Sequence, residues 1–240
     1  MTPLLERDGI ANQLLLSLPE ASLARLGPRL EAFELKRGEV LVQVDMPIKY
    51  MYFVNRGLVS LVKTMRDGRT VEIEAVGFEG IADPNMLFGV DAALLESVVQ
   101  IPGTAFRIAR DELQQAMASD PALRGQMQKY VQYAIGQLAQ TAACNRLHSI
   151  EERCCRWLLI AHDSARADRF PLTHEFLAMM LGVQRSGVSI AANFLKKAGL
   201  IDYSHGYITI VNRSGLEEAA CECYSALQAE HEKLFAARKN

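Results

Sequence analysis

The sequence predicts an α+β fold in three parts: an N-terminal β-roll of the jelly-roll kind, one long helix, and a C-terminal helical unit with a β-hairpin. Three observations lead to this prediction. Short β-rich runs separated by glycines fill residues 35–108, helical periodicity follows from about 121 to 146, and 172–210 has the pattern of two helices followed by two short apolar runs. With 240 residues, 50% of them hydrophobic and 22% charged, the chain is long enough to bury a sizeable core.

The N-terminal part is expected to begin as helix and to continue as strands. Residues 10–33 have the pattern of one or two short helices, with the serines of "SLPEASLARL" as candidate caps. The predicted strands are "EVLVQV", "YMYFV", "LVSLVKTM", "TVEIEAV" and "TAFRI". We expect turns at Gly57 and at Pro102-Gly103, and the "RDGR" sequence predicts a β-hairpin.

A short helix, "RDELQQAM", precedes the long one, which Pro121 opens at its first helical position. A stripe of mostly apolar residues then recurs in steps of three and four, at Leu123, Met127, Tyr130, Ala134, Leu138 and Thr141. Such a stripe must be buried, either against the chain's own β domain or in a coiled coil with a second copy. We expect the homodimer, since a partner could cover the stripe along its whole length.

Residues 172–201 match the pattern of a helix-turn-helix. Counting from His174 as position one, the unit requires a small residue at five, glycine at nine, and apolar residues at four, eight, ten, fifteen and eighteen. The residues present are Ala178, Gly182, Leu177, Leu181, Val183, Val188 and Ala191. Two apolar runs around Ser204-His205-Gly206 predict a hairpin, the wing of a winged helix, and Ser214 is expected to cap a final helix.

The second helix of this unit, 184–197, is the candidate for reading DNA, because it carries side chains suited to base edges and phosphates in a major groove. The predicted DNA-binding residues are Gln184, Arg185, Ser186, Ser189, Asn193, Lys196, Lys197 and, on the wing, His205. The net charge of the whole chain is -2, but four basic and two acidic residues between Leu172 and Arg213 give this segment +2. Gly187 indicates either close approach to the DNA backbone or a tight packing contact.

The order of these parts resembles the Crp-Fnr superfamily of bacterial transcription regulators along nearly the whole chain. The resemblance rests on "KRGEVLVQVDMPIKYMYFVNRGLVSL" and "LTHEFLAMMLGVQRSGVSIAANFLKKAGLI". It implies a cyclic-nucleotide-binding-like sensor domain at 1–118, a dimerisation helix at 119–147 and a winged helix-turn-helix domain at 148–240. It also implies a homodimer on near-palindromic double-stranded DNA, with two recognition helices one DNA turn apart, and RNA polymerase as a further partner.

Two segments depart from the family pattern. Members that bind cyclic nucleotides hold the phosphate with an Arg-Ser/Thr-Ala cassette, whose approximate place is taken here by Glu96, Ser97 and Val98. A carboxylate there would repel the phosphate, so we expect no binding of cyclic AMP or cyclic GMP. In the recognition helix, Arg185 keeps the family's chemistry, but Ser186 and Ile190 do not, and the operator sequence therefore cannot be carried over.

No cofactor or metal is expected. An iron–sulfur cluster needs about four thiolates or equivalent ligands, and no cysteine precedes Cys144. The five histidines also lie beyond the roll. Cys221 and Cys223 would stand about 200° apart on a helix and are not expected to converge on a metal. The cysteines are expected to be reduced thiols, ordinary ones at Cys154 and Cys155, with Cys144 as a candidate for redox chemistry.

These observations predict a homodimeric, sequence-specific DNA-binding regulator without enzymatic activity. We expect it to be cytoplasmic, because the sequence has no export signal and no apolar run long enough to span a bilayer. Its effector, its operator, its target genes and the choice between activation and repression stay open. Three alternatives remain: a regulator gated by a non-nucleotide small molecule or a redox signal, a metal-dependent β-barrel enzyme, and a signalling scaffold that does not bind DNA.

Overall fold

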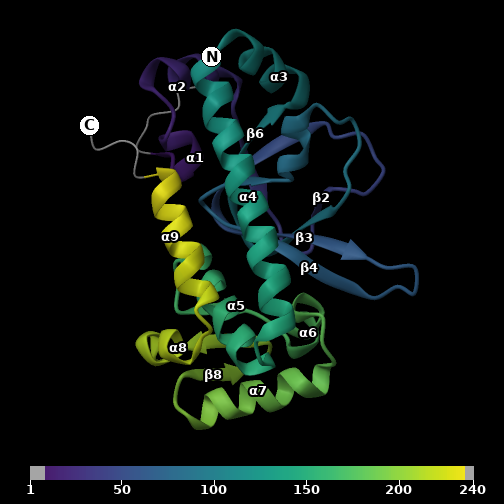
Figure 1. Cartoon of the computed structure of the whole chain (residues 1–240), viewed down its shortest axis with the longest axis vertical. Coiled ribbons are helices and arrows are strands. Elements are labelled where there is room, and N and C mark those ends of the chain that lie inside the picture. Colours follow the sequence, from purple (N-terminus) through teal and green to yellow (C-terminus); the bar gives the residue numbers. More distant parts are fainter. Residues whose placement is uncertain (1–8, 236–240) are drawn as a thin grey trace.

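The computed structural model describes residues 9–235, so the first eight and last five residues of the expected end domains lie outside it. A β-rich part and a helical part are joined by one long helix, and the α+β class is confirmed (Figure 1). The elements before the long helix are α1 (Gln13–Leu16), α2 (Glu20–Leu26), η2 (Gly27–Arg29), β1 (Glu31–Leu35), β2 (Val40–Val42), β3 (Tyr50–Thr64), β4 (Thr70–Val76), β5 (Ile81–Ala82), η3 (Pro84–Phe88), β6 (Glu96–Ala109) and α3 (Arg110–Ser119). The others are α4 (Pro121–Leu147), α5 (Ile150–Ala165), β7 (Arg169–Pro171), α6 (His174–Leu181), α7 (Arg185–Lys197), β8 (Ile201–Ser204), β9 (Tyr207–Ile210), α8 (Arg213–Ala219) and α9 (Cys223–Phe235).

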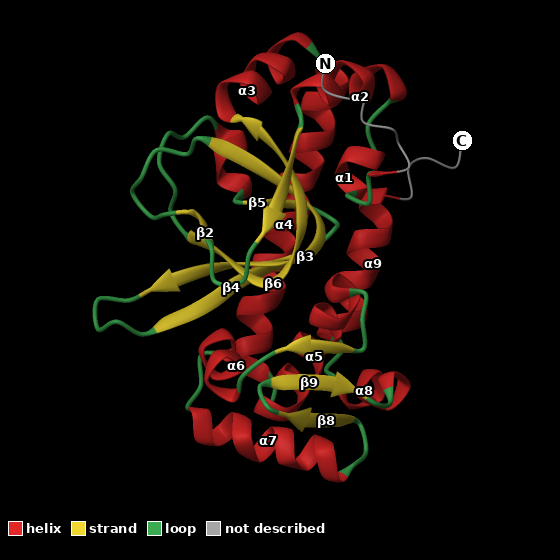
Figure 2. Cartoon of the chain, turned by 180° about the vertical axis from the view of Figure 1, so that it is seen from behind, coloured by secondary structure: helices red, strands yellow, loops and turns green. Residues whose placement is uncertain are grey.

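The roll is built around two long antiparallel strands, β3 and β6. The sheet has the order β1-β6-β3-β4, with β2 also paired to β6 and β5 to β3 (Figure 2). The predicted hairpin between β3 and β4 is confirmed: the Met65 amide donates to the Arg69 carbonyl at 2.8 Å, and Gly68 has a φ of +84°. Glycine adopts this left-handed conformation without strain, which explains the residue at this turn.

The predicted turns at Gly57 and Pro102-Gly103 are wrong. Both sites lie inside the long strands, at a place where the pairing register between β3 and β6 shifts. Gly57 has a φ of +98°, and a Cβ atom there would lie 2.5 Å from the carbonyl oxygen of Ile101. A Cβ atom at Gly103 would collide with the carbonyl of Arg56. The two strands therefore form a bulge in which their backbones are in close contact. In the sequence, glycines at such a bulge look the same as glycines at a turn.

The long helix α4 has the predicted start. The Asp120 side chain accepts hydrogen bonds from the amides of Ala122 and Leu123, and Pro121 occupies the first helical position. Its predicted stripe, however, is largely covered by the chain itself. Leu123, Met127, Tyr130 and Ala134 are at most 2% exposed, and the first three belong to the core of the roll. The expectation that a second copy buries this stripe is therefore wrong for its first half, which packs against the chain's own β domain.

The helical part has its own core, and part of the roll joins it. Leu58, Val62 and Ile101 pack with residues of α5, α6 and α7. The indole of Trp157, on α5, donates a hydrogen bond to the buried Glu72 carboxylate of β4 at 2.8 Å. The β3–β4 hairpin therefore rests on the helical part, and the two parts share an extensive apolar contact.

The last segment differs from the prediction in three ways. The expected connector near Arg169 forms strand β7, which completes a sheet of order β7-β9-β8. Asn212, not Ser214, caps α8, and its side chain accepts from the Gly215 amide at 3.0 Å. The expected final helix is divided into α8 and α9. α9 returns along α4 towards the roll (Figure 1), where Leu234 and Phe235 contact the core of the roll.

Across residues 9–235, no helix combines the length and the apolar character needed to cross a membrane.

Candidate nucleic-acid interface

The turn between α6 and α7 has the geometry that the sequence predicts. Thr173 caps α6, and its hydroxyl accepts from the Phe176 amide at 3.2 Å. Gly182 ends α6 with a φ of +64°, and the Val183 amide donates to the Ala178 carbonyl at 3.0 Å. This left-handed end turns the chain sharply into α7, as a helix-turn-helix requires.

The apolar positions of the template hold the two helices together. Four of them lie on α6 and the turn and two on α7, and all are buried or half-buried: Leu177, Ala178, Leu181, Val183, Val188 and Ala191. The buried guanidinium of Arg153, on α5, donates to the Leu181 carbonyl at the end of α6. A cation at a helix C-terminus is favoured by the helix dipole, so this contact fixes α6 on α5.

Gly187 serves packing. A Cβ atom at this position would lie 3.1 Å from Cδ1 of Ile150, the first residue of α5. Of the two interpretations that the sequence leaves open, the structure supports the tight contact with α5.

One face of α7 points away from the rest of the molecule, at the end opposite the roll (Figure 1). Its exposed residues are Arg185, Ser186, Ile190, Asn193, Phe194, Lys196 and Lys197. Gln184 stands at the N-cap position of α7, but its side chain does not accept a hydrogen bond from the helix. Within the described residues, the first turn of α7 also contains no acidic side chain. Unpaired amides and the positive end of the helix dipole make such a terminus suitable for an anion such as a phosphate.

Three of the predicted site residues are more constrained than their neighbours. Ser189 is half-buried, and its hydroxyl lies 3.1 Å from Nδ1 of His174. Lys196 forms an ion pair of 2.6 Å with Asp202 on β8. His205 lies at the exposed wing turn with a φ of 52°, and its Nδ1 is 2.7 Å from the Ser204 hydroxyl. Gln184, Arg185, Ser186, Asn193 and Lys197 are exposed.

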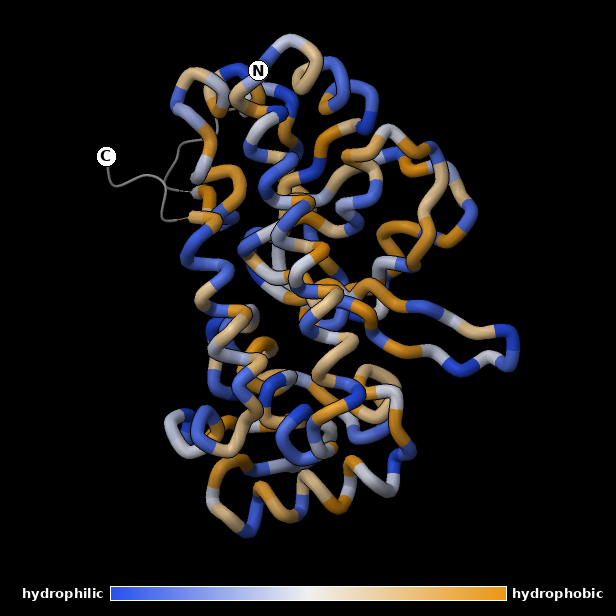
Figure 3. The backbone as a smooth tube through the Cα atoms, in the orientation of Figure 1, coloured by the Kyte–Doolittle hydropathy of each residue, from blue (hydrophilic) through white to orange (hydrophobic). Residues whose placement is uncertain are grey.

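The sequence prediction missed two aromatic side chains on this surface. Phe194 is 60% exposed on the outer face of α7, next to Ile190 at 66%, and Figure 3 shows hydrophobic and hydrophilic residues alternating along this helix. Tyr207 is 43% exposed on the wing, where the Arg169 guanidinium lies 4.6 Å from the centre of its ring. Helical periodicity predicts that Phe194 lies on the same face as Ile190, because the two residues are one turn apart.

A search of protein families agrees with this geometry. The cyclic nucleotide-binding domain family matches residues 32–120, and the Crp-like helix-turn-helix domain family matches residues 152–219. The chain belongs to the Crp-Fnr superfamily. It is thus a transcription regulator of the Crp type with a helix-turn-helix DNA-binding domain. A separate search of curated protein sequences found no match.

Solved structures of Crp-Fnr proteins have the same fold. FixK2 from Bradyrhizobium japonicum superposes with a TM-score of 0.65 at 19% identity, over 80% of this chain and 98% of its own. A putative regulator of the crp/fnr family from Eubacterium rectale gives 0.67 at 16% identity, over 86% and 96%. The c-di-GMP responsive global regulator CLP from Xanthomonas campestris gives 0.65 at 15% identity, over 80% and 99%.

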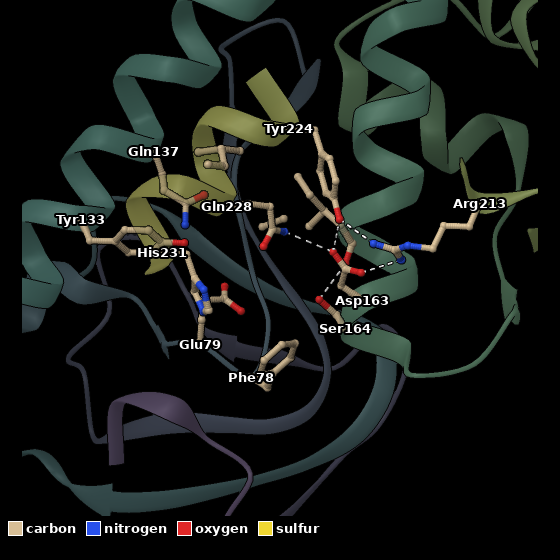
Figure 4. Close-up of a pocket in the computed structure, with 13 residues that line it drawn as sticks. Phe78, Glu79, Tyr133, Gln137, Asp163, Ser164, Arg213, Tyr224, Gln228 and His231 are labelled. Carbon is tan, nitrogen blue, oxygen red and sulfur yellow. Dashed lines mark hydrogen bonds and ion pairs between the residues drawn. The ribbon is translucent and has the colours of Figure 1, made fainter. Parts of the chain in front are cut away.

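A cavity of about 280 Å³ lies where the roll meets the DNA-binding part of this Crp-Fnr regulator (Figure 4). Asp163 of α5 forms an ion pair of 2.7 Å with Arg213 and accepts a hydrogen bond from the Tyr224 hydroxyl at 2.8 Å. Phe78 and Glu79 line the side of the roll. Because Arg213 is paired with Asp163, an anionic ligand in this cavity would have to displace a carboxylate.

The roll of this regulator is acidic on the side that faces α4. Glu74 is 3% exposed, and within the described residues both of its carboxylate oxygens lack hydrogen-bond partners. Burial, and to a lesser degree the nearby carboxylate of Glu79, raises the pKa of Glu74 to about 8. Both glutamates also lie close enough to Tyr130 of α4 to interact with it electrostatically.

The cysteines do not lie as the sequence suggests. Cys221 precedes α9 and is not on one helix with its neighbour, so the expectation that Cys221 and Cys223 point apart is wrong. The Sγ atom of Cys221 lies 3.6 Å from that of Cys144, and the Cys223 thiol belongs to the same buried cluster. Cys154 and Cys155 are buried on α5.

Proposed function

We propose that the chain is a homodimeric, sequence-specific regulator that binds near-palindromic operators and carries out no enzymatic reaction. The exposed face of α7, with Arg185 at its start and an uncapped N-terminus, is the observation that carries this proposal. Residues 1–118 would form the sensor domain, 119–147 the dimerisation helix and 148–240 the DNA-binding domain. RNA polymerase is a proposed further partner, and the protein would act in the cytoplasm.

Several exposed residues of α7 have roles that their chemistry supports. The Arg185 guanidinium can donate two hydrogen bonds to guanine O6 and N7, the commonest specific contact in a major groove. Ile190 and Phe194 can contact thymine methyl groups, which offer apolar surface in the same groove. Lys197 and the N-terminus of α7 would bind phosphates, and His205 would contact the backbone from the wing.

We expect Arg185→Ala and Lys197→Ala to have different effects on DNA binding. Losing a bidentate contact to guanine should weaken binding to the preferred site by roughly 1 to 3 kcal/mol and relax the preference at one base pair per half-site. Losing a phosphate contact should weaken binding to every duplex about equally and lower the salt slope by roughly one. Selection from a random duplex pool, followed by titrations at several salt concentrations, measures both quantities.

Ser214→Ala, on the exposed start of α8, is the matched control and should leave both quantities unchanged. A uniform loss of affinity in Arg185→Ala, with unchanged base preferences, would make Arg185 a phosphate contact. Specificity would then have to come from Gln184, Asn193 or Phe194. If the wild-type chain selects no sequence and its binding has no salt dependence, the proposed function is wrong and the scaffold alternative is favoured.

The homodimer has a candidate surface on α4 that differs from the stripe predicted by the sequence. Gln128, Gln132, Ile135, Ala139 and Ala142 follow one another in steps of four, three, four and three, and all five are exposed. Ile135 alone is 56% exposed. On α4 this exposed face is centred roughly 120° around the helix axis from the buried stripe. Ile135, Ala139 and Ala142, which are apolar or small, suit close packing against a second copy of the helix.

We expect no specific binding of cyclic AMP or cyclic GMP. Glu96 begins β6 where the family's arginine would stand, so a carboxylate takes the place of the cation that would pair with the phosphate. Calorimetric titration of the full chain with either nucleotide should give no saturable heat. Binding of the same preparation to its selected duplex is the control for active protein.

A saturable, micromolar dissociation constant for either nucleotide would contradict this prediction. It would mean that another cation holds the phosphate; Lys63 lies close to this region, where its ammonium donates to the Leu94 carbonyl at 3.1 Å. A non-nucleotide small molecule or a redox signal remains the alternative effector. The enzyme alternative predicts turnover by a metal-loaded roll, and an activity that stays after the DNA-binding residues are replaced would favour it.

A further inference from the structure

Four side chains with metal-binding chemistry converge at the junction between the long helix and the DNA-binding part. They are Cys144, His148, Cys221 and Cys223, and their nearest ligand atoms all lie within 4.8 Å of one another. Cys144 and His148 are one helical turn apart at the end of α4, so they point to the same side. Cys221 comes from the segment that joins α8 to α9 and Cys223 is the first residue of α9, more than seventy residues later.

The distances suit a single tetrahedral ion. The Sγ atoms of Cys144 and Cys221 are 3.6 Å apart, and the Sγ atom of Cys223 lies 3.5 Å from Nδ1 of His148. With Zn–S bonds of about 2.3 Å and Zn–N bonds of about 2.0 Å, the edges of a tetrahedron measure roughly 3.8 Å between sulfurs and 3.5 Å between sulfur and nitrogen. A four-iron cluster would hold its ligands farther apart, because each ligand binds a different iron atom.

Groups around the four ligands are arranged as they are at known metal sites. Nε2 of His148 lies 3.1 Å from the Glu222 carboxylate, and its Nδ1 lies 3.5 Å from Sγ of Cys223. Histidines that bind metals usually donate their other N–H group to a carboxylate in this way. The Gln140 amide also donates a hydrogen bond of 2.9 Å to Sγ of Cys223. These contacts orient the ligands and are not explained by packing of ordinary thiols.

The charge of the surroundings agrees with a group of thiolates. Three thiolates around a divalent cation leave one negative charge, which would be costly to bury without compensation. Two arginines of α5, Arg153 and Arg156, are 7% and 6% exposed. Both guanidinium groups lie close enough to Cys144 to interact with it electrostatically.

We propose that Cys144, His148, Cys221 and Cys223 bind one zinc ion in a tetrahedral site with three sulfur ligands and one nitrogen ligand. On binding, the three thiol protons are released to solvent and the histidine binds as the neutral imidazole. His148 ends α4 and the next residue, Ser149, caps α5. The ion therefore fastens the α4–α5 junction to the start of α9, and with it the DNA-binding helices to the long helix.

Metal analysis of the full chain, purified with a reductant and without chelators, tests the site. We expect about one zinc ion per chain. After the zinc is removed, titration with Co²⁺ should give sulfur-to-cobalt charge-transfer bands in the near ultraviolet and intense visible bands of tetrahedral cobalt, with an endpoint at one equivalent. Zinc should raise the thermal unfolding temperature of the stripped protein.

Cys223→Ser and His148→Ala should lose the stoichiometric zinc and change the cobalt bands, whereas Cys154→Ala, a buried cysteine of α5 outside the cluster, should keep both. If a variant does not fold, the cobalt titration of the wild-type chain, with folding checked by circular dichroism, decides alone. A folded wild-type chain without tetrahedral cobalt bands overturns the proposal. So does iron with acid-labile sulfide in anaerobically purified protein, or a Cys144–Cys221 disulfide in place of bound metal.

Discussion

The double variant Ile135→Lys with Ala142→Lys should be a monomer, and its affinity for a duplex with two half-sites should fall by at least about 100-fold. Both residues lie on the exposed face of α4, seven residues apart. In a parallel two-fold pair of helices each lysine would lie close to its own copy, and the like charges would repel. A monomer engages one half-site at a time and loses the effective concentration, of millimolar order, with which the second half-site is bound in a dimer.

Sedimentation and duplex titrations measure the two effects separately. Met46→Lys with Leu94→Lys adds the same charge on exposed loops of the roll and should remain dimeric with unchanged affinity. A variant of α4 that stays dimeric would place the interface elsewhere, and a monomer with full affinity would mean that the operator is read by one chain. Met127→Lys is unsuitable for this test, because Met127 is fully buried in the chain's own core and its loss would unfold the roll.

Glu74→Gln is expected to stabilise the protein at alkaline pH and to remove the part of the pH dependence of its stability that comes from this carboxyl. The folded carboxyl has a pKa raised from 4.5 to about 8 by burial, whereas in the unfolded chain it ionises near 4.5. Between these values the folded state binds the extra proton, so the free energy of unfolding falls as the pH rises from 4.5 to about 8. Because each tenfold change in proton affinity corresponds to about 1.4 kcal/mol, the stability lost by pH 8 is on the order of 4 kcal/mol.

Glutamine keeps the size of the side chain and cannot ionise, so the variant should gain stability relative to the wild type as the pH rises from 5 to 8. Thermal unfolding at both pH values measures this difference, which corresponds to roughly 10 °C at pH 8 for a chain of this size. Glu218→Gln, on the exposed side of α8, is the control and should show no such trend. Parallel pH profiles for Glu74→Gln and the wild type would mean that the Glu74 carboxyl titrates in the folded protein as it does in water.

The cysteine cluster shows why some site residues cannot be found from local patterns. Cys144 and Cys221 are 77 residues apart in the chain, and their sulfurs meet because α9 returns along α4. The spacing of Cys221 and Cys223 suggested divergence on the assumption that both belong to one helix. That assumption fails because α8 ends at Ala219 and α9 begins at Cys223, a break that the sequence does not mark with glycine or proline.

The sequence alone determined the features that depend on neighbours along the chain: the helix-turn-helix with Gly182 at its turn, the wing, the start of α4 at Pro121 and the strand hairpin at Gly68. These follow from backbone sterics and from hydrogen bonds between residues a few positions apart. Tertiary structure decided which face of α4 is buried, whether Gly57 forms a turn or a bulge, and which thiols meet. Each of these depends on contacts between distant segments, because an apolar stripe or a glycine fits several partners and only the assembled core selects one.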